Sequence, residues 1–254
     1  MLELRNLTKS YSGLHVASGI SFVARPGEVT GYLGPNGSGK STTMKIITGL
    51  IEPSYGQVFF RGQPIHDDLM SYRRIMGYVP EEPHLYTHLS GIEYLIMVAQ
   101  LRDMDRTIAS KRIRGLLRLF GLYSDRDVPL SSYSKGMRQK VLLSAALMHN
   151  PELVLLDEPF SGLDIGSSLV LRSLIEELAQ SGKVVLFSSH ELETVERICA
   201  HVVILHRGKV VADDSIERLR TLMSLPTLER IFAQVAVEQD TAAVSRQIAD
   251  LILA

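Results

Sequence analysis

Tryptophan is absent from this sequence of 254 residues, aromatic residues make up 6% of it, and cysteine occurs once, at Cys199. A single thiol excludes an internal disulfide and a metal site built from cysteine clusters. The same scarcity is typical of proteins that fold in a reducing compartment such as the cytosol. We therefore expect Cys199 to fill a hydrophobic core.

Long apolar runs are also missing. No run approaches the roughly 18 residues that a membrane-spanning helix needs, and the opening MLELRNLTKS has no apolar stretch of the kind found in signal peptides. We therefore expect the chain to be cytoplasmic and to take part in any membrane process only through a partner.

An excess of charge is missing as well, because 27 basic residues stand against 28 acidic ones, for a net charge of -1. Such a balance gives no general attraction to phosphate chains, so we do not expect nucleic acid as a partner. With 45% apolar residues, the chain can bury a full core as one domain, or as one domain with an appendage.

Short β-type runs are present, and helix-like stretches separate most of them. Several of these runs are apolar throughout, which is typical of strands buried on both faces of a parallel sheet. The pattern predicts an α/β fold with a mostly parallel sheet covered by helices. The runs are Glu28–Leu33, Leu153–Leu156, Val184–Ser188 and Val202–Leu205.

Between about residues 85 and 150 the strand signals vanish and helical periodicity replaces them. This change predicts an α-helical subdomain inserted at 85–150 between core segments 1–84 and 151–213. Two sets of apolar residues each share one helical face. They are Ile92, Leu95, Ile96 and Ala99, and then Ile113, Leu116, Leu117 and Phe120.

The periodicity after Asp213 predicts a helical C-terminal extension at 214–254. In it, Ile216–Leu225 and Leu228–Val235 form helices separated by Pro226. The last stretch places four apolar residues on one helical face, which needs a surface to pack on. Docking onto the chain's own domain is the favoured interpretation, and a dimer or partner contact is the alternative. The four residues are Val244, Ile248, Leu251 and Ile252.

The strongest motif is a phosphate-binding loop between a predicted strand and a predicted helix. Its glycines let successive backbone N–H groups point at phosphate oxygens, and the following helix presents its positive end. Lys40 is predicted to bridge the β- and γ-phosphates of ATP, and Ser41 to bind Mg²⁺. A chance match is on the order of one in a hundred. The loop comprises Gly34, Pro35, Asn36, Gly37, Ser38, Gly39, Lys40, Ser41 and Thr42.

Two carboxylates follow the buried run Leu153–Leu156. Nucleotide hydrolysis at a phosphate-binding loop needs a fixed carboxylate that holds Mg²⁺ beside the phosphates. Asp157 is predicted to supply this carboxylate. Glu158, one residue further on, is predicted to polarise the attacking water. The alternative is a strand end that carries two solvated acids.

A lone histidine follows another strand, in the run Val184–Ser188, Ser189, His190. Taken alone, such a histidine is more often a helix-cap or surface residue. The carboxyl ends of the strands in an open α/β sheet are where ligands collect, which favours a functional role for His190.

These motifs, with Tyr133–Lys140 before the run that ends at Asp157 and Ser161–Asp164 after Glu158, together resemble the ATP-binding cassette family over residues 1–213. The resemblance implies a P-loop ATPase core with an N-terminal antiparallel β part. It also implies that Ser134 and Gly136 belong to the signature motif and that Asp164 belongs to the D-loop. His190 then contacts the γ-phosphate, and Tyr11 stacks on adenine.

In that family two cassettes pair head to tail, so that the signature motif of each closes over the phosphate loop of the other. The resemblance thus implies a homodimer or heterodimer that acts on an integral membrane transporter subunit at the cytoplasmic face of the cell membrane. The form YSKGMRQK, together with PTLERIF near the end of the chain, is similar to exporter-type cassettes that serve a separate membrane subunit.

Two positions depart from the family pattern. The most frequent signature begins Leu-Ser-Gly-Gly-Gln, whereas Tyr133, Lys135 and Met137 replace three of those residues here. Glu81 stands where most members carry a glutamine that links the metal to the membrane-contacting helices. Two roles stay open for Glu81: a metal ligand, or a contact with the membrane partner, because a carboxylate near a triphosphate is repelled.

The leading hypothesis is therefore an ATPase that drives a transporter. Replacing Glu158, the predicted base, tests its hydrolytic step most directly. The alternative is a non-transport cassette ATPase that acts on nucleic acid or ribosomes, but the chain lacks the coiled-coil insertions, zinc modules or second cassette typical of those relatives. A module that binds ATP without hydrolysing it is disfavoured because Glu158 and His190 are both present.

Overall fold

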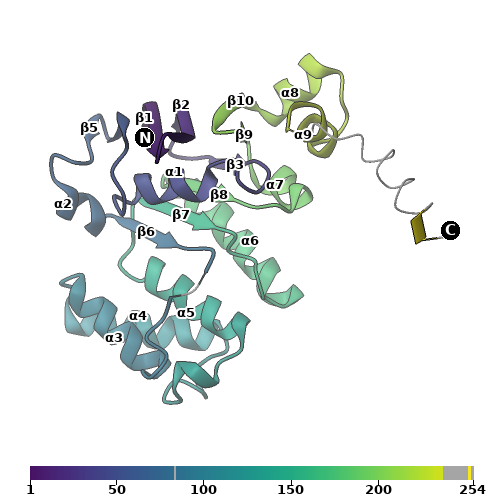
Figure 1. Cartoon of the computed structure of the whole chain (residues 1–254). Helices are drawn as coiled ribbons and strands as arrows, with labels where there is room; N and C mark the ends of the chain where they lie inside the picture. Colours follow the sequence, from purple (N-terminus) through teal and green to yellow (C-terminus); the bar gives the residue numbers. More distant parts are fainter. Residues whose placement is uncertain (83, 237–250, 253–254) are drawn as a thin grey trace.

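The computed structural model describes residues 1–82, 84–236 and 251–252. Its centre is a six-stranded sheet with the strand order β10-β9-β3-β8-β7-β6, in which β10 alone runs antiparallel to its neighbour (Figure 1). The predicted α/β fold with a mostly parallel sheet is confirmed. The strands are β3 (Val29–Leu33), β6 (Met76–Val79), β7 (Leu153–Asp157), β8 (Val184–Ser188), β9 (His201–His206) and β10 (Lys209–Ser215).

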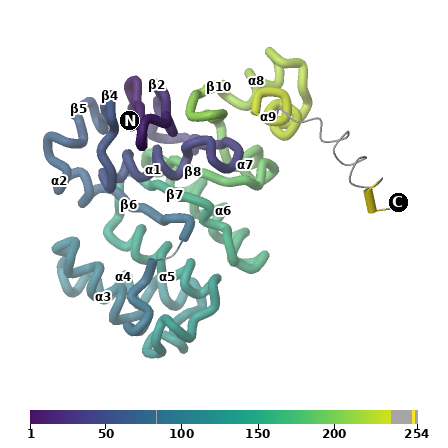
Figure 2. The backbone as a smooth tube through the Cα atoms, viewed as in Figure 1, coloured from purple at the N-terminus to yellow at the C-terminus, as the bar shows by residue number. Residues whose placement is uncertain are grey.

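A second sheet, antiparallel and with the order β2-β1-β4-β5, forms the N-terminal part. Helix α1 (Lys40–Ile47) lies with this sheet on one face of the central sheet, as the tube in Figure 2 also shows. The predicted antiparallel β part is therefore present. Its strands are β1 (Leu2–Tyr11), β2 (Leu14–Ala24), β4 (Tyr55–Phe60) and β5 (Gln63–Pro64), and helix α2 (Leu69–Arg74) follows them.

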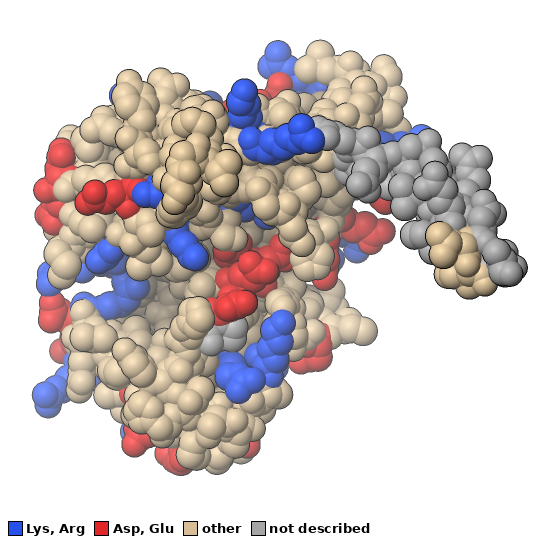
Figure 3. Space-filling view, in the orientation of Figure 1, with Lys and Arg blue, Asp and Glu red and all other residues tan. Residues whose placement is uncertain are grey.

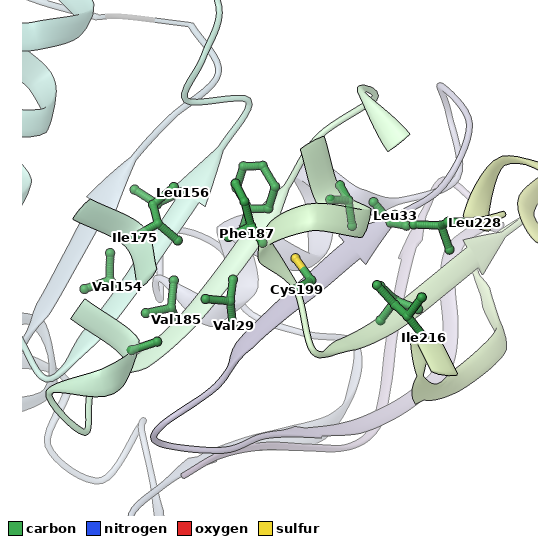
Figure 4. Packing of buried hydrophobic residues seen from close by; sticks show 14 of the residues in the cluster. Val29, Leu33, Val154, Leu156, Ile175, Val185, Phe187, Cys199, Ile216 and Leu228 are labelled. Carbon is green, nitrogen blue, oxygen red and sulfur yellow. The ribbon is translucent and has the colours of Figure 1, made fainter. Parts of the chain in front are cut away.

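Strands β3, β7 and β8 are buried at every position and mostly apolar, because both faces of the sheet are covered. Leu153 and Leu155 of β7 point to the core shared with α1, whereas Val154 and Leu156 point to the opposite core, which α6 (Ile165–Gln180) covers. Figure 4 shows the second of these cores. Each such side chain gains about 1.5–3 kcal/mol from burial. Cys199 lies in the second core, as predicted, and burial raises the pKa of its thiol.

Helices replace strands between β6 and β7, and they have a small core of their own. They are α3 (Gly91–Leu101), α4 (Arg106–Leu119), a 3-10 turn at Leu130–Ser132 and α5 (Lys135–Leu147). Ser90 starts α3 with a capping box, because its hydroxyl accepts from the Glu93 N–H while the Glu93 side chain accepts from the Ser90 N–H.

One residue of the predicted α3 face is exposed. Leu95 and Ala99 lie in the core, but Ile96 is 43% exposed. Ile92 and Ile96 line an open groove of about 360 Å³ between α3 and α4. Ile96 shares the apolar face of α3 as the periodicity predicts, but the neighbouring helices leave that part of the face uncovered.

The chain after β10 forms α8 (Ile216–Met223) and α9 (Leu228–Ala236), within two residues of the predicted bounds. Both helices pack on the chain's own core, to which Ile216, Leu219, Leu228 and Ile231 contribute. Val244 and Ile248 lie outside the described residues, and Leu251 and Ile252 are exposed. No helix in the described ranges is long and apolar enough to cross a membrane.

Candidate active site

The phosphate loop connects the end of β3 to the start of α1 and is shaped by glycines at close contacts. Gly39 caps α1 in the left-handed conformation, with φ 101°, and a side chain there would meet the Val16 carbonyl oxygen of β2. A side chain on Gly34 would meet Ser38 and the Leu205 carbonyl oxygen. Other residues would be strained or would clash at these positions, so glycine is needed for the loop to keep the tight shape that can wrap around an anion.

Lys40 folds back on the loop that carries it. Its Nζ donates to the carbonyl oxygens of Gly34, at 2.6 Å, and Pro35, at 3.2 Å. Burial lowers the pKa of the ammonium, while Glu158, Asp157 and Glu81 raise it in part. This cation is therefore held beside the loop by weak acceptors, and a phosphate is a stronger partner for it.

A pocket of about 170 Å³ brings the phosphate loop and three carboxylates together. Its lining joins segments far apart in the sequence, since Glu81 follows β6, whereas Asp157 ends β7 and Glu158 follows it. Figure 3 shows acidic side chains gathered between the core and the helices on this face, with basic ones on either side. The lining residues are Val16, Asn36, Gly37, Gly39, Lys40, Ser41, Thr42, Glu81, Asp157 and Glu158.

Asp157 is the last residue of β7 and lies directly opposite Ser188, the last residue of β8. Ser188 Oγ donates a hydrogen bond to Asp157 Oδ1. Burial raises the pKa of Asp157, and the bond from Ser188 lowers it in part. Sequence reasoning missed Ser188. The signal was a polar residue that ends an apolar run parallel to the run ending at Asp157.

Glu158 and His190 meet above the sheet edge. His190 Nδ1 lies 2.8 Å from Glu158 Oε2, and the histidine side chain is 77% exposed. Glu158 has a left-handed backbone, with φ 48°, which turns the chain sharply at the strand end. Burial raises the pKa of Glu158, and the nearby His190 lowers it in part. The helix-cap alternative fails for His190, because Glu191 occupies the N-cap position of α7 (Leu192–Ile198).

The pocket fits Mg²⁺ brought in with a nucleotide better than a metal held by protein alone. Ser41, Asp157 and Glu81 offer a hydroxyl and carboxylates, the hard oxygen ligands that Mg²⁺ prefers. Within the described part of the chain, no three His, Cys, Asp or Glu side chains are placed to hold a metal. Mg²⁺ ordinarily takes one or two carboxylates and completes its shell with phosphates and water.

The remaining predicted residues lie outside this pocket. Helix α5 begins six residues before the predicted run Val141–Met148, so Ser134 is its N-cap, and Gly136 lies in its first turn. Ser134 Oγ accepts from the Met137 N–H at 3.2 Å. Asp164 caps α6 and accepts from the Ser167 N–H and hydroxyl, which lower the pKa of Asp164 to about 2.

Tyr11 ends β1 at the hairpin whose other strand passes Gly39. Its side chain is 47% exposed, with Lys9 Nζ 5.1 Å from the ring centroid, and it does not line the pocket. An exposed ring suits a stacking platform, and the role that the resemblance implies for Tyr11 stays a prediction.

Residues 17–161 match the model of a family described as ABC transporter, and this match spans more than half of the chain. The chain belongs to the ABC transporter family. It is an ATP-binding subunit of such a transporter, in a family of cassettes that hydrolyse ATP, and ATP is its nucleotide.

Individual relatives agree with this assignment. An uncharacterized ABC transporter ATP-binding protein of Nostoc sp. is 40% identical over 79% of this chain and 60% of its own length. The alignment thus spans less than two thirds of that relative. The ABC-type transporter ATP-binding protein EcsA of Bacillus subtilis is 36% identical over 87% of this chain and 89% of its own length.

Solved structures agree on the fold of the cassette. The structure of an ATP-binding subunit of an ABC transporter has a TM-score of 0.88 at 35% identity and covers 92% of this chain and 99% of that one. A dimeric cassette in a post-hydrolysis state with ADP and Pi has a TM-score of 0.78 at 25% identity, covering 85% and 99%.

Proposed function

We propose that this ABC subunit works as half of a head-to-tail pair, of two identical or two different cassettes, that hydrolyses Mg²⁺-bound ATP to drive export. The observation that supports the pair is the separation of its two phosphate-binding elements. The pocket is lined by six residues of the loop Gly34–Thr42, whereas Ser134 and Gly136 lie outside it at the start of α5. A helix N-terminus with a free side is suited to an anion that another chain supplies. A cassette of similar fold has been solved as a dimer with ADP and Pi.

Within each pocket, Lys40 and the loop N–H groups bind the phosphates, while Ser41, Asp157 and Glu81 hold Mg²⁺, which neutralises phosphate charge when bound. Glu158 accepts a proton from the attacking water, and its raised pKa brings it nearer to neutral pH, where a base works best. His190 orients Glu158 through the contact of 2.8 Å between Nδ1 and Oε2, and it contacts the γ-phosphate. Ser134, Gly136 and Asp164 act on the nucleotide of the partner cassette, and Tyr11 stacks on its own adenine.

The groove between α3 and α4 is proposed to receive the integral membrane subunit at the cytoplasmic face of the membrane. Ile92, Ile96 and Ile113 give the groove an apolar floor, and Arg106 and Arg114 add positive charge to its lining. An amphipathic cytosolic segment with acidic side chains complements both features. Export is inferred from the sequence forms YSKGMRQK and PTLERIF.

Pairing is tested with the variant Glu158→Gln, which keeps the phosphate loop but cannot activate water. We expect its mass by light scattering to double with Mg²⁺ and ATP and to stay that of one chain with ATP and a chelator. Replacing Ser134 by Ala in the same background should weaken pairing. A Glu158→Gln chain that stays monomeric with Mg²⁺ and ATP contradicts the pair.

The membrane partner is tested by purifying the tagged chain from detergent-solubilised membranes of its source. We expect one integral membrane protein to co-purify with the wild type and with Leu119→Glu, an exposed position of α4 outside the groove. Ile96→Glu should lose it. Co-purification of nucleic acid or ribosomes alone would replace the transporter partner with the non-transport alternative.

A further inference from the structure

The first turns of α5 contact the segment Pro159–Asp164, which contains the D-loop (Ser161–Asp164), from its first residue to its last. Lys135 Nζ donates to Ser161 Oγ at 2.6 Å. One turn further on, Gln139 Nε2 donates to the Pro159 carbonyl oxygen at 3.0 Å, and Lys140 Nζ lies 3.5 Å from Asp164 Oδ2. Two elements that both lie outside the nucleotide pocket are thus joined within one chain.

The Lys135–Ser161 bond rests on a tight backbone fit. Gly162 has φ +79°, and a Cβ built on it would come within 2.9–3.2 Å of Cγ, Cδ and Cβ of Lys135. A Cβ on Gly136 would collide with the Gly162 carbonyl oxygen. The lysine stem therefore lies flat over Gly162, and the start of α5 cannot shift without pushing on this turn.

Lys135 stands where the most frequent signature sequence has glycine. A glycine has no side chain that could reach Ser161, whereas lysine adds four methylene groups and three N–H donors. Lys135 lies between Ser134 and Gly136 in the sequence, and its ammonium is directed at the D-loop of its own chain. The bond is the part of this interface that the residue at position 135 adds.

We infer that Lys135 is a positioning residue for ATP hydrolysis, which ties the D-loop to the signature residues Ser134 and Gly136 so that both move as one unit. This inference rests on the proposed head-to-tail pair, in which the two elements face the partner cassette together. A pair in which either element is displaced closes with the reacting groups out of line, and such misplacement lowers the rate of the chemical step.

A direct contact of Lys135 with the nucleotide would change the kinetic constants in a different way. If the ammonium of Lys135 contacted the partner's phosphates directly, its loss would weaken ATP binding whether or not Ser161 is present. If it acts through the D-loop, its loss lowers kcat, and the effect depends on Ser161. The two roles are therefore separated by the KM and by a double-mutant cycle.

The experiment uses the full chain with Lys135→Met, Ser161→Ala, the double variant and Lys135→Arg, and measures kcat, KM for ATP and the melting temperature of each. Lys135→Met should lower kcat about tenfold, the loss expected for one hydrogen bond to a charged group, with KM and melting temperature unchanged. The double variant should be no slower than Lys135→Met, and Lys135→Arg should recover most of the rate. Lys111→Met, on an exposed position of α4, is the matched control and should hydrolyse ATP normally.

Four outcomes overturn the inference: an unchanged kcat of Lys135→Met, additive effects of the two substitutions, a several-fold rise in KM that does not depend on Ser161, or a fall in melting temperature that accounts for the lost rate. Failure of the pair itself is distinguishable. It appears as a Glu158→Gln chain that stays monomeric with Mg²⁺ and ATP, whereas failure of this inference appears in a chain that still pairs.

Discussion

The nucleotide pocket differs from the face that carries Ser134, Gly136 and the D-loop Ser161–Asp164, here called the signature–D-loop face. The pKa values of their carboxylates are shifted in opposite directions. Burial raises the pKa of Asp157 and Glu158 in the pocket, so their anionic forms are held there at a cost. Asp164 on the other face is exposed, and hydrogen bonds from Ser167 lower its pKa to about 2. Pocket carboxylates of this kind favour a proton or a metal ion, whereas Asp164 is a permanent anion that caps α6. Burial tunes the carboxylates of the first region for proton transfer and metal binding, whereas hydrogen bonds fix the geometry of the carboxylate in the second.

The largest effect should separate chemistry from binding. Glu158→Gln removes the base, and we expect ATP hydrolysis to fall by about 10²–10⁴-fold, as general base catalysis contributes, while ATP binding persists. Phosphate release and equilibrium binding of a fluorescent ATP analogue measure the two. Glu82→Gln, at a neighbouring exposed acid, is the control and should hydrolyse ATP normally. Unimpaired hydrolysis by Glu158→Gln would remove Glu158 from the role of base.

The same residue determines the acid side of the pH profile. A base must be ionised, and burial raises the pKa of Glu158 above its ordinary value, so wild-type hydrolysis should decline as pH falls through a value above that of a solvated glutamate. Asp164 contributes nothing to this decline, because its pKa of about 2 keeps it ionised throughout. A profile that stays flat down to the ordinary glutamate range contradicts the burial of the base.

The second effect should damage the signature–D-loop face alone. Gly136→Ala places a methyl group against the Gly162 carbonyl oxygen, and we expect a loss of about 2–3 kcal/mol in the free energy of unfolding, the cost of overpacking. Gly115→Ala in α4 meets no atom within 4 Å and should gain about 0.5–1 kcal/mol from helix propensity. Urea unfolding measures both. Equal stability of the two variants would show that α5 and the D-loop are not tightly packed.

The third effect concerns a contact away from both regions, where the end of α5 meets the start of β6. His149 follows α5, and its Nε2 lies 3.1 Å from the Met76 carbonyl oxygen of β6. Arg102 Nη1 lies 2.9 Å from the same nitrogen. Burial, followed by the Arg102 charge, lowers the pKa of His149 to about 4. The unfolded chain, with a histidine pKa of about 6.5, therefore binds the proton more readily between these two values.

Wild-type stability should accordingly rise with pH from about 4 to 6.5 and be complete above 6.5, a change of about 2 kcal/mol once solvent screening of this partly exposed group is allowed for. His149→Gln, which is neutral at every pH, should lack this component. The difference between the two unfolding curves across the pH range isolates His149 from the carboxylates that titrate nearby. Parallel curves would contradict the buried neutral histidine.

The smallest effect should refine the chemistry of the pocket. Ser188→Ala removes the hydrogen bond to Asp157, and the pKa of Asp157 should rise further because that bond lowers it. We expect about tenfold more Mg²⁺ to be needed for half-maximal hydrolysis, as is usual when a residue that orients a metal ligand is lost. Ser173→Ala, on the exposed side of α6, is the control in the same Mg²⁺ titration. An unchanged requirement would show that Ser188 does not orient Asp157.

Local patterns predicted the fold well where a short segment carries its own signal. The strand of Val184–Ser188 has the bounds that its apolar run predicts, and the helices after Ser215 lie within two residues of prediction. Ile96 shows the limit of such patterns. A helical stripe specifies which residues are apolar, but the coverage of the stripe depends on the neighbouring helices.

The phosphate loop was determined by the sequence alone, because its ligands lie within nine consecutive residues and its glycines leave few backbone conformations. Strand pairing decided the rest of the site. Ser188 reaches Asp157 only because β8 lies beside β7, and Glu158 meets His190 across 32 residues of sequence. The Lys135–Ser161 bond likewise joins a helix to a loop 26 residues away. Such contacts follow from which elements become neighbours, and a chain's one-dimensional periodicity does not contain that information.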